Sequence, residues 1–235
     1  MSTDTRISAI DHLVIAAATL ADGVAWCEQT LGVSPGPGGA HPLFGTHNRL
    51  LRLHTDTGQA CYLEIIAIDP TATPQRTAPL ARWFDLDQPA LQAQLREQGP
   101  QLMHWVLRVP DIHATLAAWQ GLGIERGPAL TASRPTPHGL LQWRISVRDD
   151  GQRLMGGALP TLIQWGDVHP CDAMPESGLA LLDLILHASD TAALPQALKA
   201  AGLNGSTVHT HHAPAGLSAR LRTPRGDITL THTSP

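Results

Sequence analysis

The sequence has few of the features that mark several large classes of protein. It contains one tyrosine, two phenylalanines and a single lysine, Lys199, and its arginines are scattered along the chain. A nucleic-acid-binding protein needs a basic surface or aromatic platforms on which bases stack, so that class is not expected. With 43% hydrophobic and 15% charged residues and a net charge of −4, the composition is that of a globular protein with a core.

Long apolar runs and paired cysteines are also missing. No stretch approaches the roughly 18 apolar residues of a membrane span, and the N-terminus lacks the apolar segment of a signal peptide. The three cysteines, Cys27, Cys61 and Cys171, include no CxxC pair, which indicates free thiols in a reducing compartment. No P-loop, dinucleotide-binding glycine motif, HExxH or GxSxG motif is present. We therefore expect a cytoplasmic protein without a membrane or nucleic-acid partner.

A repeated spacing divides the chain. In each copy, a polar residue within an apolar strand is followed seven residues later by a helix-capping residue. A glycine that ends the helix follows 19 or 20 residues after the same polar residue. The three copies consist of His12, Thr19 and Gly32; His104, Asp111 and Gly123; and Asp183, Asp190 and Gly202. Such a repeat indicates one structural unit used several times.

Strand-like segments after each helix complete these units. Each unit reads β-α-β-β, with room for one more strand where residues 36–45 and 127–137 are rich in glycine and proline. The predicted organisation is a first module at residues 1–68, a linker with a short helix at 69–100, and a second module at 101–168. A third, degenerate βαββ unit packed on the others is expected at residues 169–235.

Four of the apolar strands carry one metal-capable side chain each. These residues are His12, Glu64, His104 and Gln164. A buried polar side chain without a partner is destabilising by several kcal/mol, and a single divalent cation would satisfy all four. Each residue also has a purely structural explanation, as a core histidine or as a buried amide bonded to the backbone.

The segments that hold these residues resemble a known group of proteins. DHLVIA, GGAHPLFGTHNRLL, YLEIIAIDP, SRPTPHGLLQWR and LPTLIQWGD resemble the glyoxalase-like domain branch of the vicinal oxygen chelate superfamily. The resemblance covers roughly residues 7–168. It implies an α+β fold in which tandem βαβββ modules form curved, mixed, mainly antiparallel sheets around a cavity, with a third partial module. It also implies that the first and last strands of each module hold a metal, here through His12, Glu64, His104 and Gln164.

One departure from that pattern bears on the chemistry. The fourth ligand position, often a glutamate in glyoxalases and dioxygenases, is Gln164, which cannot accept a proton at neutral pH. Proton transfer is therefore assigned to Glu64 or to a histidine in a loop near the cavity: His41, His47 or His138. An open metal site with two imidazoles and a carboxylate binds two oxygens of a substrate and stabilises an enolate.

Substrate binding is assigned to three further residues. Arg134 and Arg144 are expected to bind an anionic group, because a guanidinium pairs with a carboxylate through two hydrogen bonds; structural ion pairs are the alternative. Trp165, in the same strand as Gln164, is also expected to contact the substrate.

The predicted function is that of a glyoxalase-like enzyme that depends on a divalent metal (Zn, Ni, Co, Mn or Fe(II)). It would act on a small oxygenated or anionic metabolite through lyase or isomerase chemistry with a metal-stabilised enolate. Two alternatives stay open: an Fe(II) ring-cleaving dioxygenase, and a metal-free protein that binds a small molecule, as in bleomycin resistance. A homodimer is a further expectation.

Overall fold

The computed structural model describes residues 7–136, 139–190, 192–203 and 207–233. The first module begins with β1 (Ala9–Ala16) and α1 (Leu20–Trp26), which continues as a wider turn at Cys27–Leu31. Its remaining strands are β2 (Ala40–His41), β3 (Thr46–His54) and β4 (Cys61–Ile68), and the connecting segment carries α2 (Pro89–Gln98). The connecting segment therefore contains the predicted short helix.

The second and third units follow the same order of elements. The second comprises β5 (Gln101–Arg108), α3 (Ile112–Gly121), β6 (Ala129–Thr136), β7 (Gly139–Ser146) and β8 (Thr161–Trp165). The third comprises β9 (Leu179–Ala188), α4 (Ala193–Ala200), β10 (Val208–His212), β11 (Gly216–Thr223) and β12 (Gly226–Thr233). Short 3-10 turns lie at Met155–Gly157 and Pro170–Asp172.

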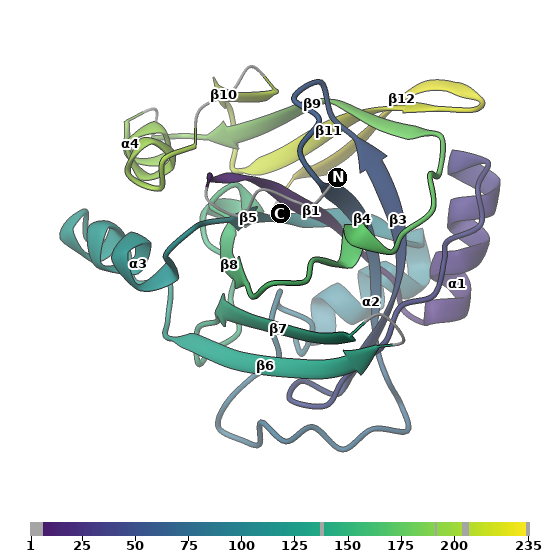
Figure 1. Ribbon diagram of the computed structural model, residues 1–235, viewed down its shortest axis with the longest axis horizontal. Coiled ribbons are helices and arrows are strands. Elements are labelled where there is room, and N and C mark those ends of the chain that lie inside the picture. Colours follow the sequence, from purple (N-terminus) through teal and green to yellow (C-terminus); the bar gives the residue numbers. More distant parts are fainter. Residues whose placement is uncertain (1–6, 137–138, 191, 204–206, 234–235) are drawn as a thin grey trace.

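The described strands form one mixed, 12-stranded sheet that curves around the interior (Figure 1). Its order is β12-β11-β9-β3-β4-β1-β5-β8-β7-β6, with β2 added to β3 and β10 added to β9. The antiparallel pair β1–β5 joins the first two modules, and a short parallel contact between β3 and β9 joins the third unit to the first. The predicted α+β fold with a curved mixed sheet is confirmed.

The third unit differs from the other two in its pairing. In the first two modules the first and last strands pair in parallel, as β1 with β4 and β5 with β8. In the third unit β9 pairs in parallel with the second strand, β10, and antiparallel with β11. Asp183, which takes the place of His12 and His104 in this unit, forms an ion pair with Arg220.

The repeated capping residues act as the spacing predicts. The side chains of Thr19, Asp111 and Asp190 accept hydrogen bonds from backbone N–H groups at the starts of α1, α3 and α4. Gly32 ends the first helical segment with φ of 76°, a left-handed conformation that glycine adopts without strain. None of the described helices has the length and apolarity needed to cross a membrane.

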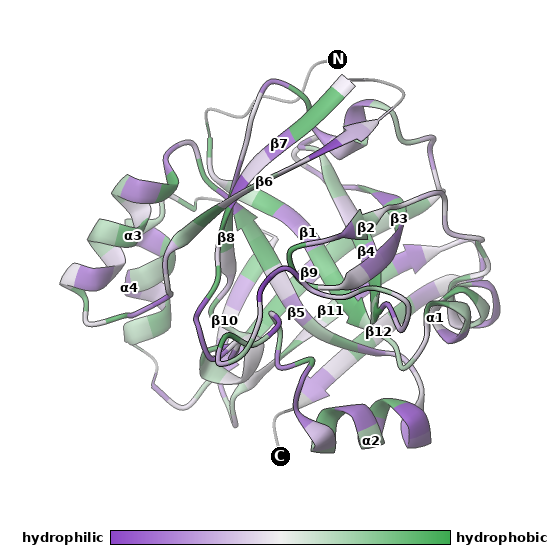
Figure 2. Cartoon of the chain, turned by 90° about the horizontal axis from the view of Figure 1, so that it is seen from below, coloured by the Kyte–Doolittle hydropathy of each residue, from purple (hydrophilic) through white to green (hydrophobic). Residues whose placement is uncertain are grey.

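Alternate residues of the central strands face two different cores. On β4, Leu63 and Ile65 pack in the larger core with side chains from the helices α3 and α4, while Ile66 belongs to the second core on the other face. The helices carry both hydrophobic and hydrophilic residues, as helices with one buried side do (Figure 2). Glu64 therefore lies on the face away from α3 and α4, where the polar side chains described below gather.

Two glycines in helices give a test of this packing. A Cβ atom on Gly23 of α1 would lie 2.3 Å from Cγ2 of Ile65, whereas one on Gly121 of α3 would meet nothing within 4 Å. We expect Gly23→Ala to lower the free energy of unfolding by about 1 to 3 kcal/mol through overpacking. Gly121→Ala should raise it by about 0.5 to 1 kcal/mol, because alanine favours the helix. Urea denaturation measures both, and equal effects of the two changes would contradict the close packing of α1 on β4.

Candidate functional site

A small chamber of about 30 Å³ lies on the inner face of the sheet, between the first two modules. Its polar lining comes from five strands, with His12 on β1, His41 on β2, Asn48 on β3, Glu64 on β4 and Arg134 on β6. The remaining lining residues are aromatic, aliphatic or proline: Leu50, Tyr62, Trp83, Phe84, Leu141, Trp143, Ile145, Ile163, Trp165 and Pro170. We call this space the inner chamber.

The carboxylate of Glu64 is held from one side. Its Oε1 accepts a hydrogen bond of 2.6 Å from Nδ2 of Asn48, whose Oδ1 accepts one of 2.8 Å from the backbone N–H of Gly39. The loop passes so close that a Cβ atom on Gly38 would lie 2.0 Å from the carbonyl oxygen of Asn48. The other oxygen of Glu64, Oε2, lies 3.6 Å from Nε2 of His12.

The position of the His12 imidazole is fixed by a hydrogen bond to Asp11, its neighbour in the sequence. Nδ1 of His12 donates a hydrogen bond of 2.7 Å to Oδ1 of Asp11, so Nε2 carries the lone pair that faces Glu64. Strict alternation would place Asp11 on the opposite face of β1. Between the pairs Ile10–Leu107 and His12–Val106 the register shifts by one residue, and this bulge brings Asp11 to the side of His12. Sequence alternation therefore missed Asp11.

The carboxylate of Asp11 is fully buried and accepts further hydrogen bonds. Its Oδ2 accepts one of 2.9 Å from Nε1 of Trp165 and one of 3.0 Å from Nε2 of His169. Nδ1 of His169 accepts the backbone N–H of Cys171, which leaves the ring proton on Nε2. Burial raises the pKa of Asp11, but the interactions with His169 and His12 outweigh it and hold the pKa well below its usual range. Asp11 is therefore ionised at neutral pH.

Two of the predicted catalytic histidines have different positions. His41 lies in the inner chamber with Nε2 4.0 Å from Oε1 of Glu64; burial, with the charge of Arg134, lowers its pKa to about 3, so it is neutral at neutral pH. His47 precedes Asn48 on β3 and so faces the other way. It lies 3.9 Å from Asp69 and does not line the chamber. The third candidate, His138, lies outside the described residues.

Two of the four predicted metal ligands are engaged elsewhere. Nε2 of His104 accepts the backbone N–H of Thr161 at 3.1 Å, and its Nδ1 donates to the carbonyl oxygen of Gly157 at 3.2 Å. Oε1 of Gln164 accepts the N–H of Ile112 at 3.1 Å, one of the free N–H groups at the start of α3. Both side chains therefore satisfy backbone groups, the structural explanation that the sequence left open.

The predicted four-residue metal site does not fit this arrangement. His12 and Glu64 come together, but neither His104 nor Gln164 lines the chamber with them. Within the described parts of the chain, no group of three or more His, Cys, Asp or Glu residues is arranged to hold a metal ion. A second register shift lies after the pair Val14–His104, where Met103 is an extra residue of β5 without a partner on β1. As a result Leu102 packs in the larger core, together with Trp105. Strict alternation along β5 would place Leu102 on the face of His104, and this shift breaks that alternation.

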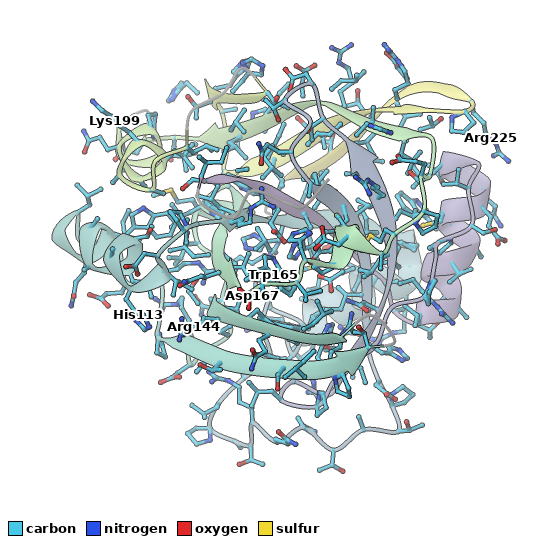
Figure 3. The ribbon with its side chains drawn as sticks, in the orientation of Figure 1. His113, Arg144, Trp165, Asp167, Lys199 and Arg225 are labelled. Carbon is cyan, nitrogen blue, oxygen red and sulfur yellow. The ribbon has the colours of Figure 1, made fainter. Side chains whose placement is uncertain are left out.

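The three predicted substrate-binding residues also separate. Arg134 lines the inner chamber, and its Nη1 is buried without a hydrogen-bond partner. Arg144 is exposed on β7, whose neighbouring residues Trp143 and Ile145 face the chamber. In the view of Figure 3, Trp165 lies near the centre of the molecule and Arg144 towards the side of His113. Trp165 lines the chamber while its indole N–H is bonded to Asp11.

The buried histidines predict a pH dependence of stability. Burial lowers the pKa of His41 to about 3, and burial, with the charge of Arg126, lowers that of His104 well below 6.5. Below pH 6.5 the unfolded chain binds protons that the folded chain does not, so stability falls as the pH drops from 6.5 towards 4. Each histidine contributes up to about 1.4 kcal/mol per pH unit.

Urea denaturation between pH 6.5 and 4.5 tests this expectation. In His104→Gln, the slope of unfolding free energy against pH should decrease by about 1 kcal/mol per pH unit, because a glutamine oxygen can still accept the N–H of Thr161 and does not titrate. An unchanged slope in this variant would show that His104 is protonated in the folded protein.

Comparisons with known proteins identify a family and one solved structure with a similar fold. A family model described as a glyoxalase-like domain matches residues 10–221. A hypothetical protein from Staphylococcus aureus is similar in structure, with a TM-score of 0.56 and 16% identity over 96% of this chain and 85% of that chain. Methylmalonyl-CoA epimerase from Mycobacterium tuberculosis has a TM-score of 0.38 and 17% identity over 70% of this chain and 91% of that chain. A comparison with curated proteins finds no match. The chain belongs to the glyoxalase-like domain family.

Proposed function

We propose that this protein is an enzyme that moves a proton on a small, oxygen-bearing anionic molecule, in an isomerase- or lyase-type reaction. One observation carries the proposal: Nε2 of His12 and Oε2 of Glu64 lie 3.6 Å apart in a chamber, and a hydrogen bond to the other polar atom of each side chain fixes its position. Asp11 holds the imidazole and Asn48 holds the carboxylate. Two proton-carrying groups fixed in this way form an acid–base pair.

The reaction starts at a carbon next to a carbonyl group. Nε2 of His12 takes the proton from this carbon, the electron pair moves onto the carbonyl oxygen, and the ionised Asp11 stabilises the imidazolium that forms. The enolate oxygen accepts a hydrogen bond from a donor in the lining, Nε1 of Trp83, which has no partner within the described residues. The proton on Nε2 of His12 passes to Oε2 of Glu64, 3.6 Å away, and from there to a carbon of the enolate, which completes an isomerisation and leaves both groups as they began.

The proposal contains no step through a metal. The ligands that the resemblance implies are divided between the chamber and backbone partners, so the described residues present no donor set for a cation. An Fe(II) dioxygenase would need that donor set to bind its iron. Metal-stabilised enolate chemistry is replaced here by hydrogen-bond donors of the chain itself.

A metal-free binding protein is the second candidate. It is favoured by a second cavity of about 560 Å³ that adjoins the inner chamber, a volume typical of sites for small molecules. Such a protein would hold its ligand without turnover, so the two functions differ in whether a proton of the ligand exchanges with solvent.

Hydrogen–deuterium exchange at carbon tests the enzyme. A panel of 2-oxo and 2-hydroxy carboxylic acids in deuterated buffer, followed by proton NMR, should show loss of a carbon-bound proton that depends on the protein. Glu64→Gln and His12→Asn should each slow this exchange by about 10²- to 10⁴-fold, while Arg144→Gln, on the exposed face of β7, should leave the rate unchanged. Exchange is expected to persist in EDTA. Exchange that chelation abolishes, or no exchange in any member of the panel, would contradict this proposal.

The bulged carboxylate gives a separate prediction. Asp11→Asn replaces the acceptor of the His12 Nδ1–H by an amide that can donate, which favours the opposite tautomer and places a proton on Nε2. We expect exchange to slow by on the order of 10²- to 10⁴-fold, and the ¹⁵N NMR spectrum of His12 to show the proton moving from Nδ1 to Nε2. A slower rate without the change of tautomer would show that Asp11 acts only by stabilising the fold.

A further inference from the structure

The larger cavity, which we call the outer cavity, has walls from separate parts of the chain. Its volume is about 560 Å³, and it is bounded by the loop at residues 34–40, the middle of β3, the end of β6 and the segment 168–177 that leads to the third unit. Four residues, Leu50, Arg134, Leu141 and Pro170, line both this cavity and the inner chamber. The two spaces therefore adjoin, with Arg134 at their junction.

Most of the outer cavity is apolar. Its lining consists largely of glycine, alanine, proline, leucine, valine and methionine side chains. Two of its charged residues neutralise each other: Nε of Arg52 lies 3.4 Å from Oε1 of Glu176, whose other oxygen lies 2.6 Å from His54. The nitrogens of His169 are both used, by Asp11 and by the backbone of Cys171. Arg52, Glu176 and His169 therefore each have partners within the protein.

Arg134 is different, because it has no carboxylate partner within the described residues. Its Nη1 is buried and unpaired, and it lies so close to the loop that a Cβ atom on Gly39 would be 1.9 Å away. A guanidinium without a partner at the edge of an apolar cavity is a site for an anion, and its flat, two-pronged geometry suits a carboxylate. The cavity therefore combines one cationic end with apolar walls.

We propose that the outer cavity binds the apolar chain of an amphipathic monocarboxylate whose carboxylate pairs with Arg134. The inner chamber, at about 30 Å³, holds only a small reacting group, so the rest of any larger substrate must lie in the outer cavity. This inference rests on the proposed function only for the direction in which the ligand points. It assigns the substrate class as acids with an aliphatic or aromatic tail, in preference to short hydrophilic acids.

Isothermal titration calorimetry with simple carboxylates tests the site without requiring turnover. Each buried methylene strengthens binding by about fourfold, so octanoate should bind at least about 50-fold more tightly than butyrate. Arg134→Gln should weaken octanoate binding by about 10- to 100-fold, and should change octanol binding by less than about twofold. The matched control Arg144→Gln, which removes an exposed arginine from the neighbouring strand, should leave the dissociation constant of octanoate unchanged.

A second variant tests the apolar part and guards against loss of folding. Ala173 is exposed to the outer cavity, so Ala173→Trp should fill it, weaken octanoate at least about tenfold, and leave butyrate unchanged. Equal affinity for butyrate and octanoate, or equal octanoate affinity in the wild type and both variants, would overturn the inference.

The same titration in Glu64→Gln separates this inference from the proposed function. Octanoate should bind to Glu64→Gln within about threefold of the wild type, because Glu64 lines the inner chamber and not the outer cavity. Octanoate binding without exchange activity in the wild type would support the outer site and refute the enzyme. Exchange activity without octanoate binding would support the enzyme and refute the outer site.

Discussion

The hydrogen bonds around the buried carboxylate of Asp11 hold the candidate site together. Burying an ionised carboxylate is destabilising by several kcal/mol unless charged and polar partners compensate. Asp11 accepts hydrogen bonds from three side chains in different parts of the chain: His12 on its own strand, Trp165 at the end of β8, and His169 in the segment that leads to the third unit. The buried Arg108 also forms an ion pair with it, with Nη1 3.9 Å from Oδ2. One side chain thereby fixes a strand of the first module, a strand of the second and the wall of the outer cavity.

The same arrangement explains how the segment that leads to β9 contributes to the site. The strand β9 pairs with the end of β3, so the segment 168–177 must cross from the second module to the first to reach it. In crossing, it brings His169 to Asp11 and Pro170 to the border of the two cavities. The segment that connects the units therefore also forms part of the lining of both cavities.

Sequence reasoning succeeded where local patterns determine structure. The spacing from strand to cap to glycine located three helices, and the side chains of Thr19, Asp111 and Asp190 make the expected hydrogen bonds. Alternation along YLEII puts Glu64 on the same face as Tyr62, and both side chains line the inner chamber. These features depend on neighbours within a few residues, which is the range over which sequence periodicity carries information.

Sequence reasoning failed where a register shift changed the face of a residue or where a distant backbone group bonded to its side chain. The bulges in the β1–β5 pair reverse the face of Asp11 and Leu102, and no residue type in the sequence marks them. His104 is a buried histidine in the predicted strand, but the N–H of Thr161, 57 residues away, occupies its ring nitrogen. Gln164 likewise caps a helix in place of binding a metal.

The sequence by itself determined the repeated units, the helix ends, the family and the convergence of His12 with Glu64. These follow from local spacing, alternation and recognisable segments. Only the tertiary structure decided which polar groups remain free for chemistry, because that depends on which backbone N–H and C=O groups arrive beside each side chain. Glu64, His12 and Arg134 line the inner chamber, whereas His104 and Gln164 accept hydrogen bonds from backbone N–H groups and do not line it.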